Sequence, residues 1–222
     1  MLLAAVLAIF ELSSFDLALQ DHFYDFASGR WCVDQKEPVG RLLFYTDPKA
    51  LAISVGVACG ACFAASFRYR RRLLAWRRPC LLIALSLTLV PLSVAGIKRL
   101  TRAHTPSQIQ RYGGRSPYVK VLEKYPQDPK SSSVARNFPA GHATAGFAFM
   151  MLYFARPRRK WLGLAAGLAM GWITGGYQTL NGEHYLSHTI VTMLVAWLVI
   201  LLIRLWASRV AWLPQVDSIR RP

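Results

Sequence analysis

The chain has 222 residues, of which 54% are hydrophobic, and its formal net charge at pH 7 is +16. Its length fits one domain, and its apolar residues form long blocks instead of the helical or alternating stripes of a soluble chain. In a soluble chain this charge would suggest nucleic acid, but in a membrane chain basic residues set topology and meet anionic head groups, so we expect no nucleic-acid partner.

Apolar runs long enough to cross a bilayer recur along the sequence. About 18 to 20 helical residues span roughly 30 Å of hydrocarbon. Four runs have this length: 50–67, 80–97, 161–180 and 186–203. A fifth, 143–155, is short, and the first, 1–14, contains Glu11 and is interpreted as a retained, tilted helix. The predicted fold class is all-α: a single polytopic membrane domain over residues 1–222 with a bundle of six transmembrane helices.

The distribution of basic residues predicts the orientation of this bundle. Lys and Arg divide almost evenly between the two sides, 14 against 13, but the 14 crowd the short loops 68–78 and 156–160 and the C-terminal tail. Dense positive charge in short loops is typical of the cytoplasmic side. We therefore expect a multi-pass protein of a bacterial-type inner (plasma) membrane with both termini in the cytoplasm.

The longest polar segment, about 101–137, is expected to form an irregular loop on the periplasmic or exterior side. Turn-forming residues recur along it: Gly113, Gly114, Pro117, Pro126, Pro129 and Ser131–Ser133. From Lys98 to Arg136 there are nine Lys or Arg but only two acids, Glu123 and Asp128. A surface this positive attracts phosphate or carboxylate groups.

The cysteines do not indicate a disulfide framework. Cys59 and Cys62 have the C-x-x-C spacing, but both lie inside an apolar run, which favours packing over redox chemistry.

Polar residues stand where apolar runs meet the predicted outer face. Six alternating helices would bring four of them together there: Lys98, His142, Gln178 and His184. Pro139 suits a helix start, and the free amides of Gly141 and His142 would present partial positive charge to an anion. His188 lies one helical turn after His184 and shares its face. Lys and His beside hydrocarbon are costly and usually functional.

These residues resemble the three motifs of a family, the membrane branch of the type-2 phosphatidic acid phosphatase superfamily. The family pattern is Lys-x6-Arg-Pro, then Pro-Ser-Gly-His, then Ser-Arg-x5-His-x3-Asp. The matching stretches here are Lys98-x6-Thr105-Pro106, Pro139-Ala140-Gly141-His142 and Tyr177-Gln178-x5-His184-x3-His188. Order and spacing agree.

The resemblance implies a two-step phosphoryl transfer that needs no metal or other cofactor. His184 would attack phosphorus and form a phosphohistidine, while His142 would protonate the leaving oxygen and later activate water. Lys98 and the Gly141 amide would hold the phosphate oxygens. The substrate would be a lipid phosphate or pyrophosphate (lipid A, a polyprenyl pyrophosphate or a phospholipid), with membrane lipids as the other partners.

Several departures from the family pattern bear on the chemistry. Thr105 and Gln178 replace the two arginines, and Ala140 replaces the serine. Neutral side chains cannot reproduce a bidentate arginine clamp, so Gln178 would be at most a weak phosphate ligand. Three residues are candidates to fill in: Arg102, His104 and Arg111. His188 replaces the aspartate that orients the nucleophile, and a neutral imidazole can still accept a hydrogen bond from His184.

Two other functions fit the same residues. The histidines His104, His142, His184 and His188 could gather around a metal in a hydrolase, although Glu183-His184-x3-His188 is not an H-E-x-x-H motif. The chain could also be a non-catalytic lipid-phosphate binding or transport protein that kept the fold. The sequence does not choose among the lipids, between hydrolysis and transfer to another lipid, or among oligomeric states.

Overall fold

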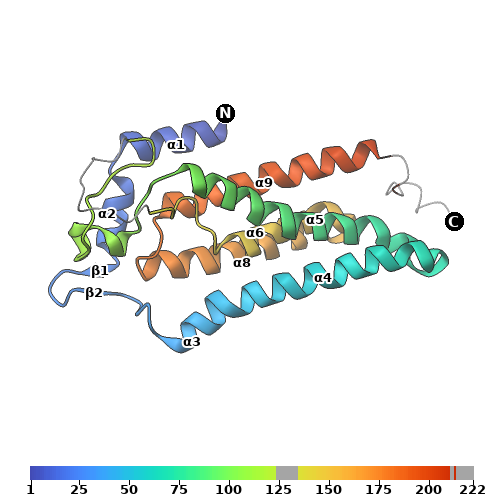
Figure 1. Cartoon of the computed structure of the whole chain (residues 1–222), viewed down its shortest axis with the longest axis horizontal. Helices are drawn as coiled ribbons and strands as arrows, with labels where there is room; N and C mark the ends of the chain where they lie inside the picture. The colour runs from blue at the N-terminus through green and yellow to red at the C-terminus, as the bar shows by residue number, and fades with distance from the viewer. Residues whose placement is uncertain (124–134, 211–212, 214–222) are drawn as a thin grey trace.

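The computed structural model of the chain describes residues 1–123, 135–210 and 213, apart from the side chain of Tyr45. Long helices lie side by side in a bundle, and short helices, a small hairpin and loops gather at one end of it (Figure 1). The four longest helices are α4 (Asp47–Arg68), α5 (Arg70–Leu100), α8 (Lys160–Leu180) and α9 (Leu186–Arg209).

Three helical stretches are long and apolar enough to cross a membrane: Pro38–Arg68, Arg70–Leu100 and Leu186–Arg209. The first of them combines α3 (Pro38–Arg41), the π-helical η1 (Leu42–Thr46) and α4. These stretches contain three of the predicted apolar runs, and they are compatible with membrane insertion. The predicted bundle of six crossings is not confirmed.

The N-terminal run forms one helix, and a second, short helix follows it. These are α1 (Leu2–Leu12) and α2 (Phe15–Asp21), which are bent by 67° and would count as a fourth crossing only if taken together. Leu3, Val6 and Leu7 of α1 pack against a cluster that includes Val94 of α5 and Val191 of α9. The first helix therefore lies against the C-terminal part of α5 and the N-terminal part of α9 (Figure 1).

The run 143–155 forms a helical stretch too short to count as a span. It consists of α6 (Thr144–Ala148), the 3-10 turn η4 (Phe149–Met151) and α7 (Leu152–Ala155), and the 3-10 turn η5 (Pro157–Arg159) leads on to α8. Its buried side chains fill the centre of the bundle. The core there comprises Leu82, Val90, Phe147, Met150, Met151 and Ile200.

A row of glycines lets α8 approach this stretch closely. Gly163, Gly167, Gly171 and Gly175 recur every four residues and so share one face of α8. A Cβ atom at Gly167 would overlap the backbone of Met150, and one at Gly171 would overlap the ring of Phe147. Close backbone approach through small residues is a common way for membrane helices to pack. The same glycines lower the hydropathy of α8, which is not among the membrane-length apolar helices.

The cap at the end of the bundle comes from the segments between the long helices. A two-residue hairpin, β1 (Tyr24–Asp25) and β2 (Arg30–Trp31), pairs antiparallel with Tyr24 opposite Trp31. The start of the predicted loop forms the 3-10 turns η2 (Pro106–Gln108) and η3 (Gln110–Tyr112). Residues 124–134 of that loop, with Pro126, Pro129 and Ser131–Ser133, lie outside the described residues.

Candidate active site

Four helix ends meet at the capped end of the bundle, which we call the site end. Here α5 ends after Lys98, α6 begins after His142, α8 ends after Gln178 and α9 begins after His184 (Figure 1). The ring centroids of His142 and His184 are 5.6 Å apart. A Cβ built on Gly141 would lie 3.2 Å from Nζ of Lys98, so the ammonium group sits beside the Gly141 backbone. The structure thus brings these predicted residues together.

The turn between α8 and α9 is held by the backbone carbonyl of Gln178. This oxygen accepts hydrogen bonds from the backbone N–H groups of Glu183 at 2.9 Å and His184 at 3.0 Å. Gly182 has a φ of +75°, which glycine adopts without strain. The side chain of Gln178 accepts a long bond of 3.5 Å from Asn181. Gln178 therefore shapes the turn that presents His184.

His184 and His188 form a buried pair. Their Nδ1 atoms are 3.2 Å apart, and each residue is 2% exposed. The ring of His188 also donates to the backbone carbonyl of Asn137. Because Nδ1 of His188 faces His184, we assign that bond to Nε2. Nδ1 of His188 is then the acceptor and Nδ1 of His184 the donor, which leaves the lone pair of His184 on Nε2.

The chain before α6 is fastened to α9. The backbone N–H of Ala140 donates to the carbonyl of His188 at 3.3 Å. The hydroxyl of Thr192 lies 3.0 Å from the carbonyl of Ala140 and 2.8 Å from that of His188. Ala140 is fully buried, at the position where the family has serine. These contacts fix the approach of His142 to the histidine pair.

The position of the first family arginine has a structural role here. Thr105 is buried and begins η2, and its backbone N–H donates to Oε1 of Gln108 at 3.2 Å. The same oxygen lies 3.2 Å from Nδ1 of His104 and accepts from Asn137 at 3.1 Å. His104 is therefore buried in a network around Gln108. Arg102, by contrast, is exposed just beyond the end of α5.

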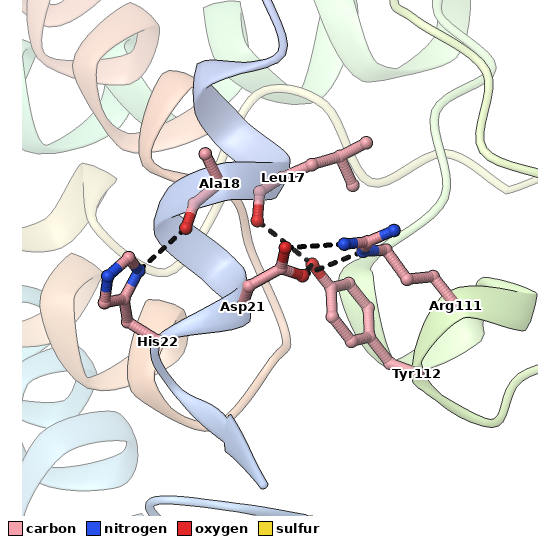
Figure 2. A network of polar contacts seen from close by, with 6 residues as sticks. All are labelled: Leu17, Ala18, Asp21, His22, Arg111 and Tyr112. Carbon is pink, nitrogen blue, oxygen red and sulfur yellow. Dashed lines mark hydrogen bonds and ion pairs between the residues drawn. The ribbon is translucent and has the colours of Figure 1, made fainter. Parts of the chain in front are cut away.

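Arg111 is engaged outside the histidine cluster. Its guanidinium group donates to both carboxylate oxygens of Asp21, at 2.8 and 2.6 Å, and the hydroxyl of Tyr112 donates to the same carboxylate at 2.9 Å (Figure 2). The network joins α2 to η3, and His22 bonds back to the carbonyl of Ala18 beside it (Figure 2). Arg111 is one of the three candidates to replace a family arginine. Its guanidinium group is thus already paired with an acidic residue of the cap.

A sequence model of one family, the PAP2 superfamily, matches residues 79–212. The match covers more than half of the chain and includes all three motif stretches. The chain belongs to the PAP2 superfamily. Searches of curated proteins and of solved structures found no match. Members of the PAP2 superfamily are phosphatases, so the chain is expected to act on phosphate esters, and the family predicted from the motifs is confirmed.

The electrostatics of this PAP2 site favour neutral histidines when no anion is bound. Burial, together with the positive charges of Lys98 and Lys49, lowers the pKa of His142 from its ordinary 6.5 to about 4. Burial also lowers the pKa of His184, with further contributions from the neighbouring His188, His142 and Lys98. A phosphate bound between His142 and His184 would neutralise the charge of the lysines, and so reverse their lowering of the histidine pKa values.

Three residues near the PAP2 motifs were not found from the sequence. Lys49, in the first turn of α4, is close enough to affect the charge state of His142. Asn137 orients His188, as described above. The carboxylate of Asp16, in α2, accepts a hydrogen bond of 3.1 Å from the backbone N–H of Ser187 in the first turn of α9. None of them lies at a motif spacing, so only the folded chain reveals them.

The histidines are not arranged as a metal centre in the part of the chain that is described. There, no group of three or more His, Cys, Asp or Glu residues is placed to hold a metal ion. The alternative of a histidine-ligated metal hydrolase therefore gains no support from this geometry.

Proposed function

We propose that the chain is an integral membrane phosphatase that acts on a lipid phosphate or pyrophosphate through a phosphohistidine. The observation that carries this proposal is the approach of His142 to His184, with 5.6 Å between ring centroids, beside the ammonium group of Lys98. A nucleophile, an acid–base group and a cation within reach of one phosphate are what the transfer requires.

In the first step, Nε2 of His184 attacks phosphorus and the P–O bond to the lipid breaks. His142 gives its proton to the leaving oxygen, and the lipid departs as an alcohol, or as a phosphate when the substrate is a pyrophosphate. In the empty site the pKa of His142 is about 4, so His142 takes up its proton with the anionic substrate. In the second step, neutral His142 removes a proton from water, which attacks phosphorus and breaks the P–N bond.

His188 is a positioning residue in this mechanism. It accepts the N–H of His184 at 3.2 Å, and so it holds the tautomer whose Nε2 can attack. Unlike the family's aspartate, it carries no negative charge to stabilise the cationic ring that forms on attack. We expect slower turnover than a carboxylate at this position would give.

The phosphate would be held by positive groups that partly replace the missing arginines. Lys98 lies beside the Gly141 backbone, Lys49 is near enough to lower the pKa of His142, and Arg102 follows the end of α5. We place this site at the exterior or periplasmic face of the inner membrane, with both chain termini in the cytoplasm. The substrate phosphate would then enter from the outer leaflet.

A second candidate function is the binding or transport of a lipid phosphate without hydrolysis. The observation that favours it is the use of Thr105 and Gln178, at the two arginine positions, as structural residues of their turns. A site without these arginines could bind phosphate and yet stabilise the transition state poorly.

The test is phosphate release from a panel of lipid phosphates by the purified protein in detergent. The panel contains lipid A, a polyprenyl pyrophosphate, phosphatidylglycerol phosphate and phosphatidic acid. Wild type is compared with His184→Ala, with the exposed His22→Ala as matched control, and with wild type in chelator.

We expect release that survives chelation and the control substitution and disappears in His184→Ala. Loss on chelation would indicate a metal-dependent reaction instead. Saturable binding of a panel lipid with no release, even when a lipid alcohol is added as acceptor, would favour the non-catalytic function.

A further inference from the structure

An apolar groove lies at the end of the bundle opposite the histidines, which we call the arginine end. Its walls come from α4, α5, η4, α7 and α8, and include Val55, Cys59, Ile83, Phe149 and Leu162. Its volume of about 400 Å³ falls within the roughly 300–1,000 Å³ of small-molecule pockets. The groove is separate from the site of the proposed phosphatase reaction and does not depend on it.

The groove exists because α4 and α8 pack on different neighbours. α4 lies along α5, whereas α8 lies along α6, η4 and α7. Exposed Ala166 of α8 and half-buried Cys59 of α4 line the space between them. In a helix that crosses a membrane, an apolar gap of this kind faces lipid tails and not water.

Cationic and aromatic residues border the groove at the arginine end. Arg156 and Arg159 line it, and the guanidinium carbon of Arg156 is 5.7 Å from the ring centroid of Trp76, which also lines it. Tryptophan is typical of the boundary between hydrocarbon and head groups. The groove therefore has apolar walls at membrane depth and positive charge at the interface.

The described part of the chain supplies no negative charge at this end. Its acids lie in α1 and α2, between β1 and the first turn of α4, next to the loop at Glu123 and in the α8–α9 turn, all toward the site end (Figure 1). Around the groove the charged residues of the turns are all basic: Arg68, Arg70–Arg72, Arg156, Arg158, Arg159 and Lys160. A counter-charge for Arg156 and Arg159 must come from outside the described chain.

We propose that this groove binds an anionic glycerophospholipid from the leaflet at the arginine end. One acyl chain lies between α4 and α8, and the phosphate contacts Arg156 and Arg159 beside Trp76. Basic pockets between transmembrane helices bind anionic head groups in this manner. A second copy of the chain is the poorer occupant, because two arginine ends would repel each other.

The test uses phosphatidylglycerol that carries a photoreactive diazirine in one acyl chain, added to the full-length protein in detergent. Mass spectrometry of the crosslinked peptides maps the lipid, and native mass spectrometry counts the lipids retained. Phosphatidylcholine with the same chains is the neutral comparison. Phosphatidylglycerol is a phosphodiester, so phosphatase activity does not consume it.

We expect crosslinks on peptides around Cys59, Ile83 and Leu162, and at least a tenfold preference for phosphatidylglycerol over phosphatidylcholine. The double substitution Arg156→Gln with Arg159→Gln should remove that preference, whereas Arg158→Gln, in the same turn, should keep it. Ala166→Phe should block the crosslinks, and the exposed Ala169→Phe on the same helix should not.

Three results would overturn the proposal. They are equal crosslinking by the two lipids, crosslinks spread evenly around the bundle, and a dimer that excludes lipid from the groove. Each can be obtained with a protein that has no phosphatase activity, so failure of the lipid site and failure of the proposed reaction are distinguishable.

Discussion

His188 stands where a carboxylate would orient the nucleophile, and its neutral ring does only half of that task. It accepts the N–H of His184 but offers no charge to the ring that becomes cationic on attack. His188→Asp should therefore raise turnover, whereas His188→Leu, which can accept nothing, should lower it on the order of 10³-fold. The Michaelis constant should change little in both, since His188 does not touch phosphate. Steady-state kinetics with a short-chain lipid phosphate measures both constants, and full turnover in His188→Leu would contradict this role.

The buried histidines also make stability depend on pH. The pKa of His142 is about 4 in the folded protein and ordinarily 6.5, so between these values the unfolded chain binds more protons. The free energy of unfolding should therefore fall as the pH drops from 6.5 to 4, by up to about 3 kcal/mol for this residue alone. The lowered pKa of His184 adds a contribution of the same sign.

Melting temperatures in detergent across this pH range test the prediction. His142→Asn should flatten the slope, and the exposed His22→Asn should leave it unchanged. A melting temperature that rises toward pH 4 in the wild type, or an equal slope in His142→Asn, would show that His142 is not neutral in the folded site.

At this scale the sequence predicted the candidate residues that the fold brings together, but not the residues that support them. Lys98, Gly141, His142, His184 and His188 occupy motif positions, so their spacing was sufficient to select them. Asn137 acts through its backbone carbonyl, Lys49 through its charge and Asp16 by capping a helix. Interactions of these kinds need no fixed spacing in the sequence. Arg111 was a reasonable candidate from its charge alone, but only the fold shows that Asp21 holds it.

Among the elements, α8 packs closely through its glycine face, which meets the backbone of the neighbouring helical stretch. A Cβ at Gly171 would overlap the ring of Phe147, whereas one at Gly176, on the same helix, would meet nothing within 4 Å. Gly171→Ala should therefore push α6 away, lower the melting temperature by several degrees and reduce activity, since His142 precedes α6.

Gly176→Ala is the matched control for that packing. It should be neutral or slightly stabilising, because alanine favours helix over glycine by up to about 1 kcal/mol. Equal melting temperatures for the two variants would mean that α8 and α6 are farther apart than described.

Elements were predicted best where apolar residues run without interruption. The runs in α4, α5 and α9 form membrane-length helices, and the run in α5 does so although Pro91 lies inside it. The run 143–155 forms short helical pieces, and the chain bends by 67° between α1, formed by the N-terminal run, and α2, which follows it. In both places contacts with other helices decide the local geometry, and a single-sequence pattern does not contain those contacts.

On the scale of the whole molecule, charge separates the two ends of the bundle. The site end mixes acids and bases, and the arginine end, where it is described, is basic throughout. This asymmetry supports an orientation with the arginine end in the cytoplasm. Cys32, exposed in the cap after β2, should then react with a membrane-impermeant maleimide in cells whose outer permeability barrier has been opened.

The opposite end supplies the control for that topology. Ser208→Cys, near the exposed end of α9, in a Cys32→Ser background should react only after the inner membrane is permeabilised. Labelling of Ser208→Cys in intact cells, with Cys32 protected, would invert the orientation.

The central claim is that His184 carries the phosphoryl group, and trapping the phosphoenzyme tests it most directly. The protein is mixed with a lipid phosphate labelled at phosphorus and quenched within milliseconds. We predict a phosphate that is labile in acid and stable in base, located on His184 and absent in His184→Ala. With a pyrophosphate substrate, whose phosphate leaving group needs no proton from His142, the intermediate should accumulate in His142→Ala, which lacks the base for its hydrolysis. Phosphate release by wild type with no trapped intermediate in either wild type or His142→Ala, or a phosphoenzyme that persists in His184→Ala, would contradict the account.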